Sequence, residues 1–267
     1  MPQYACVLTV FLWANAQLAH AQWAGHERLT RQSLVERLDR EPPGVKAELP
    51  AKDLSNLDLS GVDFHSANLS ASVFNGANLT RAKLDGCNLT VTFFEGADLS
   101  AASLRNATLF SVQLAHGNLR GADLSGARLI GDLRHADVSS ANLTRMNAAA
   151  DMKNQSMGLM RTNLVGAKAI GADFSGSDFS RADLSFSDFT GAKLVATKLY
   201  HADLSGTVLI GADLTKADLQ ASQLINADLS HANLTEADLT GAELQGVRGL
   251  NTAILTGAKG LPAPDPR

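Results

Sequence analysis

The chain has 267 residues, of which 45% are hydrophobic, 5% aromatic and 19% charged, with a formal net charge of −4 at neutral pH. This apolar content excludes a disordered chain, and two cysteines cannot make a disulfide framework. The mild acidic excess argues against nucleic-acid binding through basic patches, and no apolar run reaches the length of a membrane-spanning helix. The apolar residues are mostly Leu and Ala, which indicates a small repeated unit.

Residues 1–21 have the pattern of a secretory signal peptide. An apolar run at residues 5–13 is followed by Ala19-His20-Ala21, an A-x-A cleavage pattern, and a second such pattern lies at residues 14–16. The segment before the run has no Lys or Arg, which departs from the usual signal. We expect cleavage after Ala21 and export to the periplasm or the cell exterior. The alternative is a cytoplasmic protein with a buried N-terminal strand or helix.

Residues 22–50 are expected to form an N-terminal cap and linker. Within them, residues 26–40 predict a short amphipathic helix that ends at the Pro-Pro-Gly sequence of residues 42–44. Its apolar face would carry Leu34, Val35 and Leu38, and Ser33 and Glu36 have the spacing of a capping box. We expect this helix to cover the open end of the domain that follows.

A period of five begins at Leu54. Every fifth residue from Leu54 to Leu129 is Leu or Phe, and the series resumes from Leu164 to Leu244 with Ala169 as its exception. This period fits neither an α-helix at 3.6 residues per turn nor a strand at 2. One inward residue in five instead predicts a chain that turns a corner once per repeat.

The repeat has the consensus A-[D/N]-L-[S/T]-G, as in residues 121–125 (GADLS) and 211–215 (GADLT). It resembles the pentapeptide-repeat family over about residues 51–245. The resemblance implies an all-β solenoid: a right-handed quadrilateral β-helix with 20 residues per coil. In that family the central Leu or Phe and the small residue two before it both point inward, which would make Cys87 a packing residue.

The implied core includes six residues that we single out from both ends of the repeat domain: Leu79, Leu99, Leu124, Phe174, Leu204 and Leu214. Strands stacked ~4.8 Å apart would give a rod about 45–50 Å long. Two outward columns alternate in charge, namely Asp173, Lys193, Asp213 and Asp178, Lys198, Asp218. Stacked opposite charges favour a 20-residue coil, although most of the charges are expected to form a solvated face.

The register slips after Leu129. The apolar positions at Leu133, Val138 and Leu143 lie one residue early, and residues 150–152 and 155–157 read as repeats one further residue early. Residues 158–161 then restore the original register. We therefore predict that the β-helix is interrupted at residues 144–163 by a bulge or a projecting loop.

This interruption holds four of the five methionines. The candidate partner-docking segment comprises Met146, Met152, Met157, Met160 and Arg161. Two other interpretations stay open: Met152 and Met157 fill irregular space in the core, or the thioethers bind Cu(I). Met is more often a packing residue than a ligand, so we assign no metal and no cofactor.

Residues 246–267 are expected to form a C-terminal cap and a disordered tail, with residues 253–257 as one more repeat displaced by one position. An open solenoid end must be capped or paired. A homodimer through the C-terminal end is one solution, and the family offers precedents.

The sequence contains no HExxH, CxxC, GxSxG, P-loop or dinucleotide-binding motif. The repeat itself demands Asp, so paired Asp residues say nothing about acid–base catalysis. We therefore predict a non-enzymatic, exported interaction scaffold with an unknown protein partner, no nucleic acid and no membrane span. One alternative is a DNA mimic that binds topoisomerases and confers inhibitor resistance, as some members of the family do. The other is a Met-rich metal-binding module at the interruption.

Overall fold

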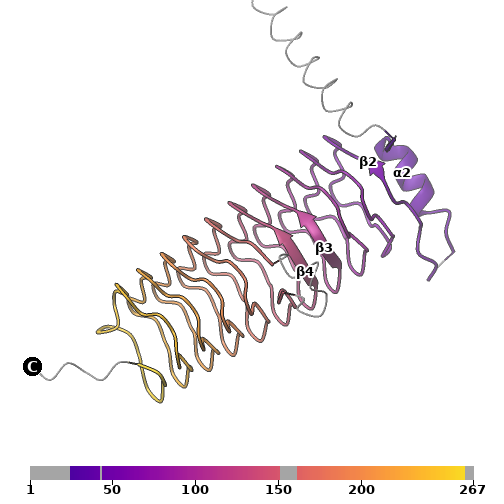
Figure 1. Ribbon diagram of the computed structural model, residues 1–267. Helices are drawn as coiled ribbons and strands as arrows, with labels where there is room; N and C mark the ends of the chain where they lie inside the picture. Colours follow the sequence, from indigo (N-terminus) through magenta and orange to yellow (C-terminus); the bar gives the residue numbers. More distant parts are fainter. Residues whose placement is uncertain (1–24, 43, 151–160, 262–267) are drawn as a thin grey trace, which may run out of the picture.

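The fold is seen in a computed structural model that describes residues 25–42, 44–150 and 161–261. The chain winds into a rod of stacked coils, with the N-terminal cap at one end and residue 261 at the other (Figure 1). None of the helices in the described ranges is long and apolar enough to span a membrane.

The N-terminal cap consists of β1 (Glu27–Arg28), which pairs in parallel with β2 (Lys52–Asp53), and of α2 (Arg31–Leu38). Leu34 and Leu38 of α2 are buried in the core, while Val35 is partly buried against it. The predicted apolar face is thus present on a shorter helix, because residues 27 and 28 form a strand. This arrangement covers the apolar interior at the N-terminal end.

The capping box of α2 differs from the predicted one. Thr30 is the N-cap: its side chain accepts a hydrogen bond from the Ser33 backbone N–H at 3.1 Å, and the Ser33 hydroxyl accepts one from the Thr30 N–H at 3.0 Å. Glu36 instead accepts a hydrogen bond from the Gln32 amide at 2.9 Å. The helix therefore begins three residues earlier than the Ser33–Glu36 pair implied, and Ser33 takes the place usually held by Glu or Gln.

Each regular coil of the β-helix has 20 residues, as predicted. On one face Asp58 pairs with Asn78, Asn78 with Asp98 and Asp98 with Asn118, all in parallel. The hydrogen bonds run between neighbouring coils: the Leu99 N–H, for example, donates to the Asn118 carbonyl at 2.7 Å. Because every coil bonds the coils on both sides, the rod is one continuous ladder.

The interior is filled by the central residues of the repeat. The six core residues singled out from the sequence, Leu79, Leu99, Leu124, Phe174, Leu204 and Leu214, are each no more than 1% exposed. Cys87 lies at a small inward position and is fully buried, and burial raises the pKa of its thiol to about 12. Cys87 is therefore a packing residue with an inert thiol.

The Asp or Asn before each central residue closes a local turn. Asp58 Oδ1, for example, accepts a hydrogen bond from the Ser60 N–H at 3.1 Å, and Asp123 Oδ1 accepts one from the Ser125 N–H at 3.0 Å. These bonds satisfy backbone donors at the corners of the coil. The abundance of Asp and Asn thus follows from the fold.

The predicted register slip after Leu129 is present and lies within a pair of extended strands. β3 (Thr108–Gln113) pairs in parallel with β4 (Arg128–Asp132), and a bulge at Ser111 makes that coil one residue short. Gly131 permits this one-residue shortening of the coil, because a Cβ there would lie 2.2 Å from the Val112 carbonyl oxygen. The slip therefore requires glycine at that position.

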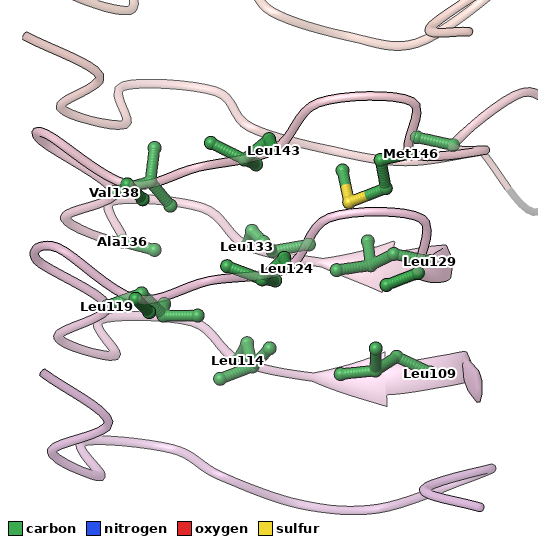
Figure 2. Close-up of a cluster of buried hydrophobic side chains, with 14 of the residues drawn as sticks. Leu109, Leu114, Leu119, Leu124, Leu129, Leu133, Ala136, Val138, Leu143 and Met146 are labelled. Atoms are coloured by element: carbon green, nitrogen blue, oxygen red, sulfur yellow. The ribbon is translucent and has the colours of Figure 1, made fainter. Parts of the chain in front are cut away.

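The interruption is shorter than the predicted 144–163. Residues 144–150 continue the coil, with Ala148 at the central position and Met146 at the small inward position. Figure 2 shows the Met146 side chain among the inward Leu and Val side chains of two neighbouring coils. The ladder then pairs Asp132 with Asn163, so the extra residues lie between Ala150 and Thr162. The repeats proposed at 150–152 and 155–157 lie outside the described residues, apart from Ala150.

The C-terminal end is a final, partly exposed coil. Ile254 pairs with Asn233, 21 residues earlier, which bears out the predicted repeat displaced by one position. Leu244 and Leu255 pack against the core but are only partly buried, and Ile254 is 53% exposed. Within residues 161–261 no helix covers this end. The predicted tail at 262–267 lies outside the described residues.

Candidate interaction surface

Many of the outward carboxylates have an amide or a cation next to them in their own column. The amide of Asn78 donates to Asp58 at 3.0 Å, and Lys198 lies 3.6 Å from Asp178 on the opposite face. Amide or cationic residues thus separate most acidic residues along the ladders. The described surface shows no continuous acidic stripe, which a DNA mimic would need.

Of the predicted docking segment the structure describes Met146 and Arg161, and it does not bring these two to one surface. Met146 is 2% exposed, and its backbone N–H donates to the Ser177 hydroxyl at 2.9 Å. Arg161 is half-exposed and donates to Asp183 at 2.7 Å. The other three residues, Met152, Met157 and Met160, lie outside the described residues. Met146 therefore belongs to the core and cannot act as a surface contact in this fold.

A hollow of about 280 Å³ lies beside Arg161, where the shortened coil leaves space. Its wall includes Arg134, whose guanidinium binds both oxygens of Asp132 at 2.9 and 2.6 Å. Arg134 lowers the pKa of Asp132, against the effect of partial burial. No group of three or more His, Cys, Asp or Glu side chains in the described ranges could hold a metal ion. The hollow thus holds neutralised charges and no evident catalytic arrangement.

At one corner of the coil, bulky side chains pack against a glycine of the next coil. We call its residues the corner column; in the described ranges it comprises Asn56, Gly76, Gly96, His116, His135, Gly166, Phe186, Gly206, Asn226 and Gly246. A Cβ on Gly166 would lie 2.6 Å from the His135 ring, and a Cβ on Gly206 would lie 2.7 Å from the Phe186 ring. Because these glycines have no side chain, each ring packs directly against the backbone of the next coil.

Phe186 is the most exposed large apolar side chain in the described part of the chain, at 70%. Its backbone has φ +58°, a left-handed conformation that is strained for residues other than Gly, Asn and Asp. Leaving an aromatic ring in water gives up the free energy that its burial would supply. The fold thus holds Phe186 outward at a cost in both hydration and backbone energy.

Other outward positions of the neighbouring coils also carry exposed or half-buried apolar side chains. The ladder stacks Lys168, Asp188 and Val208 on the adjoining face, and Ile170 and Ile210 each stand two residues beyond a member of that ladder. Ile170 is 43% exposed and Ile210 37%. Together with two half-buried residues on the other side of the corner, they form what we call the Phe186 ridge: Val165, Ile170, Phe186, Val208, Ile210 and Ile225.

The same positions are polar before the interruption. The corresponding outward residues of the first coils are Ser55, Asn75, Glu95, Ser60, Thr80 and Ser100. Val91 is also exposed, at 44%, but it lies on another corner of the coil. The apolar ridge is therefore a local property of residues 161–230.

Acidic residues border the Phe186 ridge. Asp188 and Asp203 each accept hydrogen bonds at Oδ1 from their own turns, at 2.9 Å from the backbone N–H. Neither forms an ion pair among the described residues, although the exposed Lys168 stands next to Asp188 in the ladder. Asp228, by contrast, pairs with Arg248 at 3.2 Å. These carboxylates can therefore form ion pairs with cationic side chains of a partner.

Sequence reasoning missed the Phe186 ridge because it concentrated on the interruption and its methionines. A signal was present in the repeat: Ile170, Phe186 and Ile210 occupy positions where the consensus has Ser, Thr or Gly. A tabulation of apolar residues at outward repeat positions would have found these residues. Their proximity to one another needs the 20-residue coil as well.

Comparison with known proteins agrees with this architecture. The sequence model described as pentapeptide repeats matches in eight copies, which span residues 53–145 and 159–259. No curated protein matches the chain. Among solved structures, the chain is similar to HetL, a pentapeptide repeat protein involved in heterocyst differentiation regulation from the cyanobacterium Nostoc sp. strain PCC 7120. The identity is 31% and the TM-score 0.59, over 90% of this chain and 94% of HetL.

It is also similar to QnrB1, a plasmid-mediated fluoroquinolone resistance protein, with 20% identity and a TM-score of 0.41 over 79% of this chain and 88% of QnrB1. Repeat spacing, coil geometry and the matched family model agree over most of the chain, which therefore belongs to the pentapeptide-repeat family.

Proposed function

We propose that the protein is a non-enzymatic scaffold that binds a protein partner through an outward face of its rod. The Phe186 ridge carries this proposal, because a rod with a filled interior can act only through its surface. The regular ladder holds surface side chains in fixed positions, which lowers the entropy lost on binding. The involvement of HetL in regulation is a role that a binding protein can fulfil.

A panel of photo-crosslinking residues in the native host tests the scaffold function. A photoreactive phenylalanine analogue is placed, one position at a time, at Asn75, Phe186, Ile210 and Gln220, which sample different outward positions. A reproducible adduct with another protein at any position supports the proposal. No adduct at any of the four positions, with normal expression, would count against it.

We also propose that the protein is exported. The A-x-A pattern before Gln22 supports this, and cleavage after Ala21 would remove none of the described residues. Cell fractionation and intact-mass spectrometry provide the test. A chain that begins at Gln22 outside the cytoplasm is the expected result, and a full-length cytoplasmic chain would overturn export.

We further propose that two copies pair through the C-terminal end. The support is the final coil, where Ile254 is exposed and Leu244 and Leu255 are only partly buried. Light scattering on the purified protein should give twice the mass of one chain. Ile254→Asp should return a monomer with an unchanged circular-dichroism spectrum, and a wild-type monomer at all concentrations would refute the pairing.

A further inference from the structure

We infer that the Phe186 ridge docks a protein partner whose contact surface has an apolar socket bordered by Lys or Arg side chains. This inference rests on the proposed scaffold function and adds the chemistry of the partner. It depends on three observations: a strained aromatic anchor, exposed isoleucines at the far edge of the adjoining face, and carboxylates that form no ion pair among the described residues.

The anchor is Phe186, and the fold does not require a Phe there. Asn56 and Asn226 occupy the same corner column with φ of +57° and +59°, and Asn tolerates this conformation better than Phe does. The Phe186 ring is seated on Gly206, so its orientation is set before any partner binds. Pre-oriented aromatic side chains of this kind are typical centres of protein interfaces.

The face beside the anchor carries Lys168, Asp188 and Val208, and Ile170 and Ile210 stand at its far edge. Ile170, Thr190 and Ile210 stack in one column, and the glycines that follow them at the next corner, Gly171, Gly191 and Gly211, have nothing within 4 Å of a Cβ position. These three corner positions therefore present no side chain beside the isoleucines, and the next position of the corner is His231. A partner can lie flat against the column and cover Phe186 in the same contact.

The carboxylates that border the Phe186 ridge favour a partner with positive charge. Asp188 stands two residues after Phe186, and Asp203 stands three residues before the glycine that seats the ring. In both carboxylates the second oxygen has no hydrogen-bond partner among the described residues, whereas Asp183 is paired with Arg161 at 2.7 Å. Partner cations would gain charge-assisted hydrogen bonds there. A second copy of this chain would instead bring its own Asp188 and Asp203 into the contact, which like charges disfavour.

The test begins with the adducts from the photoreactive residue at Phe186 and Ile210, with Asn75, next to the corner column in the first segment, as the comparison position. Peptide mapping identifies the partner and its contact segment, and the purified partner is then titrated against the full chain. We expect adducts at Phe186 and Ile210 but not at Asn75, and a contact segment that contains Lys or Arg beside apolar residues.

Two variants then separate the anchor from the charges. Phe186→Asn should weaken binding at least about tenfold and leave the fold intact, because Asn suits this backbone conformation. Asp188→Asn with Asp203→Asn should weaken binding severalfold and reduce its dependence on salt. Thr80→Asn, on the polar side of the interruption, is the control and should leave binding unchanged.

The outcomes are distinct. Adducts only at Asn75 or Gln220 would overturn this inference while leaving the scaffold function in place. An adduct of two copies of this chain, or binding that the double Asp variant leaves unchanged, would also overturn it. The absence of adducts at all four positions would overturn both proposals.

Discussion

The segments before and after the interruption share an interior and differ at their surface. Leu79 and Leu204 are both fully buried in stacked coils, and the turns around them use the same Asp or Asn hydrogen bonds. At one corner, however, Asn75 and Glu95 in the first segment give way to apolar residues around Phe186 in the second. The comparison shows that the repeat constrains inward positions and leaves the outward ones free to change.

This difference follows from the energetics of the two kinds of position. A buried Leu contributes about 1.5–3 kcal/mol by leaving water, and its replacement leaves a cavity in a rigid ladder. An outward substitution usually changes stability by less than about 0.5 kcal/mol. Selection for binding can therefore act on outward residues without loss of the fold.

The largest expected effect tests whether the cores of the two segments are equivalent. Leu124→Asp in the first segment and Phe174→Asp in the second should each cost more than about 4 kcal/mol, because each buries an unpaired charge. Urea denaturation followed by circular dichroism measures both. Asp123→Asn is the control and should be nearly silent, since its turn hydrogen bond can be kept. Wild-type stability in either Asp variant would show that its coil is assigned wrongly.

A smaller effect sharpens the contrast at the corner column. Gly96 and Gly206 have φ of +63° and +65°, but only Gly206 has a neighbouring ring within 4 Å of its Cβ position. Gly96→Ala should cost about 1 kcal/mol from backbone strain alone, and Gly206→Ala about 1–2 kcal/mol more. The excess should disappear in a Phe186→Ala background when the variants are compared by thermal unfolding. An equal loss of stability in the two Gly→Ala variants would show that the Phe186 ring does not pack on Gly206.

Two buried threonines provide a further contrast between the segments. Thr92 is fully buried and its hydroxyl has no hydrogen-bond partner among the described residues, whereas the Thr197 hydroxyl donates to the Phe174 carbonyl at 2.9 Å. Thr92→Val should therefore raise the free energy of unfolding by about 1 kcal/mol, and Thr197→Val should lower it by a similar amount. Urea midpoints of both variants decide the matter, and a loss of stability in Thr92→Val would contradict the assignment.

The smallest effect concerns pH and the N-terminal cap, which only the first segment has. Hydrogen bonds from Arg37 and then Lys52 lower the pKa of Glu27 from 4.5 to about 2, against a small effect of burial. Because the folded pKa lies below the unfolded one, the stabilisation is complete above pH 4.5 and is lost as the pH falls toward 2. Melting temperatures of wild type and Glu27→Gln should differ at pH 6 and converge near pH 2. A constant difference across that range would rule out Glu27 as the cause.

Much of the fold was readable from the sequence because the repeat is regular. The period of five identified the inward residues, including Leu124 and Phe174, and the shift after Leu129 located the slip. The candidate site was not readable in the same way. Met146 was assigned to a docking segment because methionines cluster nearby in sequence, but the coil continues through residue 150 and turns Met146 inward.

The sequence by itself determined which side chains face inward, since one apolar residue in five can be buried only if the chain turns at every repeat. Only the tertiary structure decided which outward residues meet. Ile170, Phe186 and Ile210 are separated by 16 and 24 residues along the chain, yet they lie on the two edges of one face in three successive coils, because each coil advances the rod by a single strand spacing. The packing of Phe186 on Gly206, and the lack of ion pairs at Asp188 and Asp203 among the described residues, likewise depend on distances between coils, which no linear pattern records.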